Sequence, residues 1–405
     1  MPKKMKDSGI EWIGKIPEDW DIIKGKYIYD ITTGKLDANA EDIGGIYPFF
    51  TCSMEPKKIN SYAFDCEALL VAGNGIVGFT QYYKGKFNAY QRTYVLSNFS
   101  KIINPKYLKF YVSDLLEEAV TTESYGSVIS FIKLDNLKNF YVVFPSIAEQ
   151  TKIANFLDDK CSKIDKAIEL NKRAIDELEE YRTSLVSRMI KGHNKKCDFK
   201  DSNINYLGKI PGDWKLTRLG HVFYIKKDIA GKEGYDVLSI TQSGIKIKNI
   251  EGNEGQLASD YSKYQLVKIN DFAMNHMDLL TGWVDCSKYY GVTSPDYRVF
   301  NFIDELKYDR QYYLFMMQLF YKEKVFYGFG QGVSNLGRWR LPKDNFLNMI
   351  IPVPPIEEQK RIGQYLSNFN NLIKKDILIR QKYIEQLEEY KKSLIYEAVT
   401  GKIEV

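Results

Sequence analysis

Residues 14–20 read Gly-Lys-Ile-Pro-Glu-Asp-Trp, and this stretch decides the fold because the chain repeats it. Residues 208–214 read Gly-Lys-Ile-Pro-Gly-Asp-Trp, a shift of 194 (208 minus 14). A second motif, Glu-Gln-x-x-Ile-x-x-x-Leu, begins at Glu149 and again at Glu358, a shift of 209 (358 minus 149). The chain therefore holds two copies of one plan, whose intervening regions differ in length by 15 residues (209 minus 194).

The gapless part of each copy predicts a long helix, over 146–192 in the first copy and over 355–405 in the second. Leu-Glu-Glu-Tyr ends at Tyr181 and again at Tyr390, still 209 apart. Ser146 with Glu149 three residues later is a capping box at the start of the first helix. Gly192 and Gly401 stand where helix C-caps are expected.

Apolar residues recur along both predicted helices at three- and four-residue steps, with polar interruptions at matching places. This heptad seam predicts an antiparallel coiled coil within the chain and a pseudo-twofold internal repeat. The alternative is that each apolar stripe covers its own domain. From Ile164 to Met189 the seam spans about 38 Å, close to one turn of B-DNA. The seam residues are Ile164, Ile168, Ile175, Leu178, Leu185, Ile373, Ile377, Ile384, Leu387 and Leu394.

The inserts between the repeated ends, 21–144 and 215–353, have mixed patterns. Short apolar runs predict strands, and longer amphipathic stretches predict helices. The predicted fold class is α+β, with two mixed α/β domains separated by the two long helices. The predicted strands are 69–72, 141–144, 237–240 and 349–351, and the predicted insert helices are 106–118 and 308–321. The predicted division is 1–145, 146–192, 193–354 (a linker and the second domain) and 355–405.

Composition narrows the functional classes. The chain has 405 residues, of which 44% are hydrophobic and 27% are charged, which is typical of a folded protein. No apolar run approaches the roughly 20 residues of a membrane-spanning helix, so we expect no membrane association. Five scattered cysteines indicate a cytoplasmic protein. The net charge of +5 is weak evidence for a polyanionic partner and does not identify it.

Two motifs resemble those of enzymes and are better explained as turns. Residues 73–78 match the dinucleotide fingerprint Gly-x-Gly-x-x-Gly, but a strand-like segment follows where a helix N-terminus must receive the phosphates. We therefore expect a hairpin turn there. Residues 294–297, Ser-Pro-Asp-Tyr, resemble the motif of an amino-methyltransferase, but an aspartate replaces the second proline. We expect a turn at a strand edge.

Asp296, Glu305 and Lys307 fit the pattern of a metal-dependent nuclease, in which carboxylates converge on a divalent ion. Against this, Glu305 and Lys307 are expected to open a helix, and the first copy lacks the acidic pair. We predict no catalytic residue and no metal site. A metal-dependent nuclease using these three residues, or a coiled-coil scaffold that binds no DNA, remain the alternatives to a DNA-reading subunit.

The repeated Gly-Lys-Ile-Pro-x-x-Trp, the Glu-Gln-x-x-Ile helix start and Leu-Glu-Glu-Tyr resemble the specificity subunit of type I restriction–modification enzymes, in order and in duplicate. Asp-Asn at 135–136 and at 344–345 extends the resemblance. The resemblance implies a non-catalytic subunit whose two inserts are target recognition domains, each reading half of a bipartite double-stranded DNA site. The helix pair would set the spacing.

The same resemblance implies partners and cofactors. Two methyltransferase subunits would dock on the chain and bring S-adenosylmethionine, and two restriction subunits would use ATP and Mg²⁺. This chain itself would bind no cofactor.

Base reading requires side chains with suitable hydrogen-bonding groups at loops. The candidates for DNA contact therefore come from loops rich in asparagine, glutamine, arginine, lysine, serine and tyrosine. In the first domain they are Asn74, Gln91, Arg92, Tyr125, Ser127 and Lys133, and in the second they are Asn275, Ser294, Tyr297, Arg298, Gln331, Asn335, Arg338 and Arg340.

Overall fold

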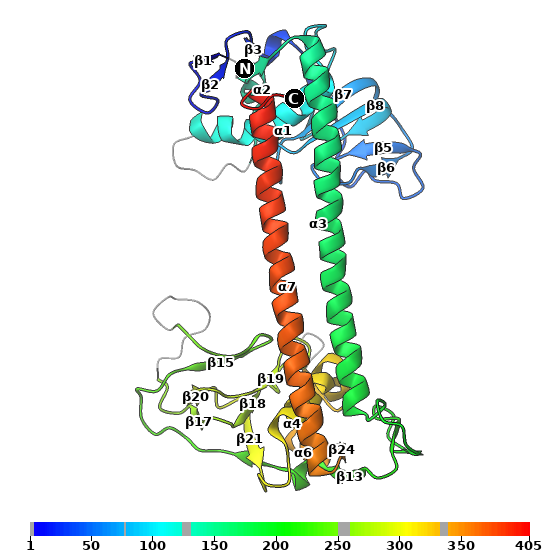
Figure 1. The fold of residues 1–405 in the computed structure, drawn as a ribbon, viewed down its shortest axis with the longest axis vertical. Coiled ribbons are helices and arrows are strands. Elements are labelled where there is room, and N and C mark those ends of the chain that lie inside the picture. Colours follow the sequence, from blue (N-terminus) through cyan, green and yellow to red (C-terminus); the bar gives the residue numbers. More distant parts are fainter. Residues whose placement is uncertain (1–3, 77, 124–130, 250–259, 333–338) are drawn as a thin grey trace. The chain divides into compact units, whose positions relative to one another are not determined.

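A computed structural model describes residues 4–76, 78–123, 131–249, 260–332 and 339–405. The chain folds as two compact units (Figure 1). The first unit contains residues 1–173 and 380–405, and the second contains residues 174–379. Each unit therefore combines one insert with part of each long helix.

The first unit is built on a six-stranded sheet with the order β4-β9-β7-β8-β5-β6. Its neighbours are antiparallel except β5 and β8, which are parallel. Two smaller antiparallel pairs, β1-β2 and β3-β10, complete it. The bounds are β1 Met5–Asp7, β2 Lys15–Pro17, β3 Asp21–Lys24, η1 Gly25–Tyr27, β4 Asp30–Thr33, β5 Tyr47–Phe50, β6 Lys57–Ile59, β7 Phe64–Ala72, β8 Thr80–Ala89, β9 Thr93–Ser97, α1 Pro105–Glu123, α2 Leu134–Asn139 and β10 Tyr141–Phe144.

The second unit has a four-stranded antiparallel sheet with the order β14-β21-β18-β19. Five antiparallel pairs surround it: β11-β12, β13-β24, β15-β16, β17-β20 and β22-β23. The bounds are β11 Phe199–Asp201, β12 Lys209–Pro211, β13 Lys215–Arg218, η2 Leu219–His221, β14 Phe223–Lys226, β15 Leu238–Thr241, β16 Gly244–Ile247, β17 Gln265–Val267, β18 Phe272–Met274, β19 Val284–Cys286, β20 Gly291–Thr293, β21 Arg298–Phe302, α4 Arg310–Lys322, α5 Val325–Gly328, β22 Gln331–Gly332, β23 Trp339–Arg340, α6 Lys343–Asn348 and β24 Ile350–Val353.

The insert helices differ from their predicted bounds. Helix α1 is longer than predicted, and α4 begins at Arg310 because Asp309 is its N-cap. The Asp309 carboxylate accepts a hydrogen bond of 2.8 Å from the backbone N–H of Tyr312. The expectation that Glu305 and Lys307 open this helix is therefore wrong, since both lie in the turn before the cap.

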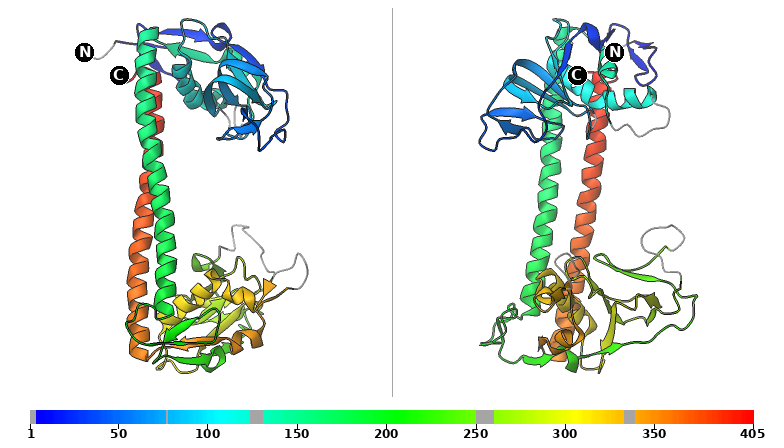
Figure 2. Two further views of the ribbon diagram at one scale, coloured as in Figure 1. Left: turned by 90° about the vertical axis from the view of Figure 1, so that its right-hand side faces the viewer. Right: turned by 180° about the vertical axis from the view of Figure 1, so that it is seen from behind.

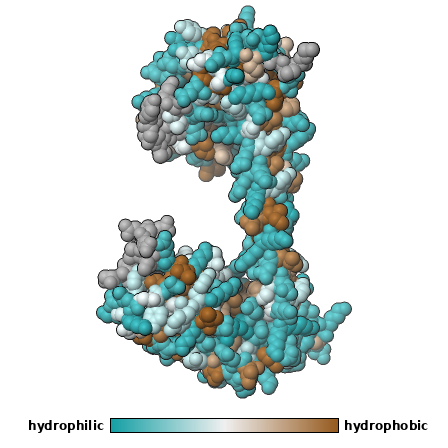
Figure 3. All heavy atoms as spheres, turned by 60° about the vertical axis from the view of Figure 1, so that its left-hand side comes forward, coloured by the Kyte–Doolittle hydropathy of each residue, from teal (hydrophilic) through white to brown (hydrophobic). Residues whose placement is uncertain are grey.

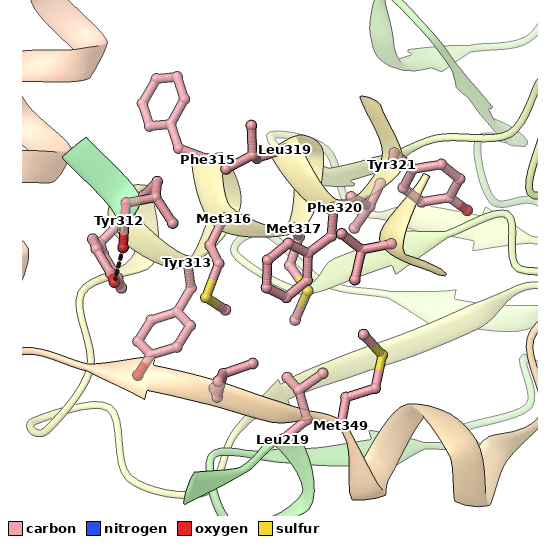
Figure 4. Packing of buried hydrophobic residues seen from close by; sticks show 14 of the residues in the cluster. Leu219, Tyr312, Tyr313, Phe315, Met316, Met317, Leu319, Phe320, Tyr321 and Met349 are labelled. Carbon is pink, nitrogen blue, oxygen red and sulfur yellow. Dashed lines mark hydrogen bonds between the residues drawn. The ribbon is translucent and has the colours of Figure 1, made fainter. Parts of the chain in front are cut away.

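Aromatic and methionine side chains of α4 form the centre of the second unit's core (Figure 4). Tyr313, Met316, Met317 and Phe320 are each fully buried. Helix α4 therefore turns one continuous apolar face toward the strands, and a face of this kind supplies most of a helix's stability in a folded domain.

The two long helices are α3 (Ile147–Ile190) and α7 (Ile356–Val399), each of 44 residues. The Ser146 hydroxyl accepts a hydrogen bond of 3.4 Å from the N–H of Glu149, as the capping box predicts. Gly192 and Gly401 end the helices with φ of +75° and +73°. Only glycine adopts this left-handed conformation without strain, and so the expected C-caps are confirmed.

The long helices pair antiparallel in each unit, as Figure 1 and the right-hand view of Figure 2 show. In the first unit, Arg380 donates a hydrogen bond of 3.1 Å to Asn171, its counterpart 209 residues earlier. In the second unit, Arg182 donates a hydrogen bond of 3.3 Å to Asn370. A low number on α3 thus meets a high number on α7 and the reverse, as the antiparallel arrangement requires.

The predicted seam lies between the helices. Ile164, Ile168, Leu185, Ile373, Ile384 and Leu394 are buried, and Ile175, Leu178, Ile377 and Leu387 are half-buried. Most of the surface visible in Figure 3 is hydrophilic, with apolar residues in small patches. The predicted fold class, with two α+β domains, a paired set of long helices and an internal repeat, is confirmed.

The repeated opening motif has a structural role, which is to hold the end of a long helix. A Cβ atom built on Gly401 would lie 2.5 Å from the ring of Pro17 and 3.0 Å from Trp20. A Cβ atom on Gly192 would lie at the same two distances from the second copy's proline and tryptophan. Each copy's opening motif therefore receives the helix end of the other copy, which explains why motif and glycine both recur.

Candidate functional site

Three strand-end loops come together at one edge of the first unit's sheet. Asn74 follows β7, and Arg92 precedes β9, which pairs with β7. The N–H of Gly73 donates a hydrogen bond of 3.0 Å to the carbonyl of Arg92, and Asn74 forms a β-bridge with Phe131. The structure thereby brings the candidates Asn74, Gln91, Arg92 and Lys133 into one region.

These first-domain candidates differ in what holds them. Gln91, Arg92 and Lys133 are exposed, and Asn74 is half-buried. The Gln91 amide donates a hydrogen bond of 2.8 Å to Asp37. The N–H of Lys133, the N-cap of α2, donates one of 2.9 Å to the side chain of Asn136. Arg92 and Lys133 therefore present cationic side chains beside the Asn74 loop.

The second unit assembles its edge in the same way. Asn275 follows β18, and Arg298 opens β21, whose partner across the ladder is Met274. The β22-β23 hairpin joins this edge because the N–H of Leu341 donates a hydrogen bond of 2.9 Å to the carbonyl of His276. Gln331 and Arg340 are paired, exposed residues at the base of this hairpin.

The turn at 294–297 lies beside the same edge. Its half-buried Ser294 and Tyr297 both offer their carbonyls to the buried amide of Gln265, at 2.8 and 2.6 Å. The N–H of Tyr297 donates a hydrogen bond of 3.0 Å back to Ser294, so the expected turn is confirmed. The hairpin expected at 73–78 is also confirmed, because it joins the antiparallel strands β7 and β8.

Arg298 is buried, unlike the other described candidates. Its guanidinium donates a hydrogen bond of 2.9 Å to the carbonyl of Leu341 and lies 4.7 Å over the ring of Phe346. Burial lowers the pKa of Arg298 to about 10, so that the group stays charged at neutral pH. Burial, together with the charges of Arg298 and Arg340, lowers the pKa of His276 to about 3 and keeps its ring neutral.

Sequence reasoning missed His276 and Phe131 as members of these edges. His276 directly follows the candidate Asn275, and this adjacency is the signal that could have identified it. Phe131 could be found from the repeat alone, since it stands 209 residues before Arg340. Four candidates, Tyr125, Ser127, Asn335 and Arg338, lie outside the described residues.

The nuclease alternative gains no support from the geometry. The Glu305 carboxylate forms an ion pair of 2.9 Å with Arg310, and Lys307 pairs with Asp304 at 2.8 Å. Within the described ranges, no three His, Cys, Asp or Glu side chains gather so that they could hold a metal ion. The described helices also include none that is long and apolar enough to cross a bilayer.

A cleft of about 570 Å³ lies beside α4 in the second unit. Among the residues that the structure describes, four cationic side chains and one carboxylate, that of Asp285, line it. Burial and the nearby charge of Arg182 lower the pKa of Lys322, one of the four. The cations are Arg182, Lys322, Lys324 and Lys374. Such a cleft favours an anionic ligand.

Each of the two repeated α+β domains gathers loops at a sheet edge and is joined to an antiparallel pair of helix segments. These features define a recognition protein with two binding domains. The sequence profile of the type I restriction modification DNA specificity domain matches residues 17–180 and 211–388. The chain therefore belongs to the family of type I restriction–modification DNA specificity subunits.

Individual relatives agree with this assignment. The MjaVIII specificity subunit of Methanocaldococcus jannaschii is 28% identical over 425 residues, covering 96% of this chain and 94% of the relative. The EcoDI specificity subunit of Escherichia coli is 33% identical over 236 residues, covering 54% of this chain. That match spans about half (51%) of the length of the E. coli subunit.

Solved structures share the fold. A chain from a study of complex assembly and conformational transition of the type I R-M system superposes with a TM-score of 0.69 at 14% identity, covering 96% of this chain and 99% of its own. The HsdS subunit from Thermoanaerobacter tengcongensis gives 0.51 at 13% identity, covering 96% and 98%.

Proposed function

We propose that each domain of this specificity subunit reads one half of a bipartite DNA target through the loops gathered at its sheet edge. The observation that supports this most strongly is that both units gather the same three loops with different side chains. Exposed arginine, lysine and glutamine groups can reach phosphates and base edges, which are the contacts that position and specify. The unlike residues of the two edges would give unlike half-sites.

The chain is proposed to be non-catalytic and to act in the cytoplasm with partner subunits. Two methyltransferase subunits carrying S-adenosylmethionine would dock on the helix pair, and two restriction subunits would use ATP and Mg²⁺.

The helix pair is proposed to set the number of base pairs between the half-sites. Adding one heptad to α3 and to α7 would lengthen each helix by about 10 Å. At about 3.4 Å per base pair, the gap should grow by roughly three base pairs. An unchanged gap would refute the spacing role and leave base reading untouched.

The test of the proposed function is an exchange of one domain. Residues 21–144 are replaced by the matching insert of a relative, and the chain is produced in cells together with its methyltransferase partner. Sequencing of methylated sites should reveal a two-part target in which one half has changed and the other is intact. Changes in both halves, or methylation without any two-part target, would contradict the proposal.

A further inference from the structure

The two sheet edges share a backbone frame that can be matched residue by residue. In the first unit the N–H of Ile132 donates a hydrogen bond of 2.8 Å to Gly73, and the Tyr94 hydroxyl donates one of 2.9 Å to the Ile132 carbonyl. In the second unit the same two bonds join Leu341 to His276 and to Arg298. Ile132 and Leu341 stand 209 residues apart, as the repeat requires.

The strand ladders give the same correspondence. Tyr94 pairs with Val71 across β9 and β7, and Arg298 pairs with Met274 across β21 and β18. Gly73 stands two residues after Val71, as His276 does after Met274. Three positions therefore match between the edges: Gly73 with His276, Tyr94 with Arg298 and Phe131 with Arg340.

These matched positions carry opposite chemistry. In the first domain they hold no charge, and Phe131 is 53% exposed. In the second domain they hold two arginines and a histidine. The two edges share the same hydrogen bonds to Ile132 and Leu341, whereas the side chains at the matched positions differ in charge, size and polarity. A position of this kind can distinguish two half-sites.

Two side-chain nitrogen atoms of the second-domain group are buried without a hydrogen-bond partner among the described residues. Of the described residues, none accepts a hydrogen bond from Nη1 of Arg298 or pairs with Nδ1 of His276, although both atoms are buried. The described part of the chain also shows no ion pair for Arg298 or Arg340. A buried cation without a counter-charge is costly unless a ligand supplies an acceptor.

We propose that Arg340 reads a guanine in the second half-site. Arg298 and His276 hold it in place through their hydrogen bonds to the neighbouring Leu341. The O6 and N7 atoms of guanine form the acceptor pair that an arginine fork matches in the major groove. Arg298 and His276 are positioning residues, because both bond Leu341, which directly follows β23, and so hold that strand at the sheet edge. Arg298 also adds a positive charge beside it, whereas the His276 ring stays neutral. At the matching position the first domain has Phe131, whose side chain carries no hydrogen-bond donor. The inference rests on the proposed DNA-reading function.

The test compares three variants of the full chain, each assembled with its methyltransferase partner. Methylated sites are mapped, and affinity is measured on the mapped duplex across a salt series. Arg340→Phe installs the residue of the first domain. Arg340→Lys keeps the charge but removes the fork. Lys343→Ala is the matched control, because it removes an exposed cation three residues away.

Arg340→Phe and Arg340→Lys should each lower the preference for guanine at one position of the second half-site by roughly ten- to a hundredfold. The first half-site should stay unchanged, and Lys343→Ala should keep the guanine preference. If Arg340→Lys restores wild-type behaviour, or if Arg340→Phe weakens all sites uniformly and lowers the salt slope by about one, the arginine contacts phosphate and the inference fails. A wild-type second half-site without guanine also overturns it, whereas a wild-type chain without a two-part target would overturn the proposed function instead.

Discussion

The two units attach their domains to the long helices through the same contacts, which we call the frame, but they carry different residues at their sheet edges. The amide of Gln150 bonds the N–H of Asn104 at 2.7 Å, and Gln359 bonds the N–H of Asp309 at 2.9 Å. In both units a tyrosine of the insert helix donates a hydrogen bond to the carbonyl that ends a long helix: Tyr107 to Val399, and Tyr312 to Ile190. These frame contacts need a fixed geometry, and so their residues recur.

The sheets between these contacts differ. One unit has six strands with a parallel step, and the other has four strands and several detached pairs. The two copies therefore share the groups that attach each domain to the helices, whereas the attached domains differ. Variants of the frame should therefore have matched effects in both units, and variants elsewhere should not.

The largest expected effect is at the helix ends. Gly401→Ala and Gly192→Ala should each lower the free energy of unfolding by about 2–4 kcal/mol, because a Cβ atom is strained at positive φ and overlaps a proline ring. Urea unfolding of the full chain measures both. Gly14→Ala is the control, since Gly14 has φ of +71° but open space around its Cβ position. Equal losses in all three variants would show that strain alone matters and that the proline contact does not.

The buried glutamines should come next. Gln150→Ala removes an amide that also donates 2.9 Å bonds to the carbonyls of Ile102 and Pro145. We expect a loss of about 2–3 kcal/mol, because buried backbone groups are left unpaired. Gln359→Ala should cost somewhat less, since its bond to Lys307 is longer, at 3.5 Å. A larger loss at Gln359 would break the proposed equivalence of the two frames.

A smaller effect on stability is expected at Asp114, a position at which the two insert helices differ. Asp114 of α1 stands where α4 has the buried Leu319, each seven residues after the matched tyrosine. Burial raises the pKa of Asp114 to about 6, above the unfolded value of about 3.9, and the charge of Lys392 opposes this only in part. The native state therefore favours the protonated carboxyl, and its stabilising contribution is present below about pH 4 and lost as pH rises through about 6.

Asp114→Asn should accordingly raise the free energy of unfolding at pH 7 by on the order of 1–2 kcal/mol, and this gain should shrink toward zero near pH 4. Urea unfolding at pH 4, 5, 6 and 7 measures the difference. A gain that is constant over this range would mean that the carboxyl does not titrate there.

The smallest effect is expected at an exposed pair on the helices. Lys172 and Glu388 lie 3.9 Å apart, and both side chains are more than half exposed. Lys172→Ala should change the free energy of unfolding by less than about 0.5 kcal/mol, because water and salt screen such pairs. A loss above 1 kcal/mol in the same urea experiment would show that this pair helps to fix the helices.

The frame could be predicted from the sequence because its signals are local or repeated. Gly192 and Gly401 act through their own backbone conformation, Ser146 bonds an N–H only three residues away, and the seam follows from apolar spacing. The edges could not be predicted fully, because Arg298 lies in a strand whose burial depends on the distant Leu341 and Phe346. Nothing near Arg298 in the sequence shows that a carbonyl 43 residues later accepts its hydrogen bond.

If the two units share their attachment to the helices and each insert alone determines its half-site, the two inserts should be interchangeable. The most direct measurement is methylation mapping with a chain that carries residues 21–144 in both positions. We expect a palindromic two-part target, in which the first half-site appears twice as an inverted repeat. A target that keeps the original second half, or one with unrelated halves, would contradict it.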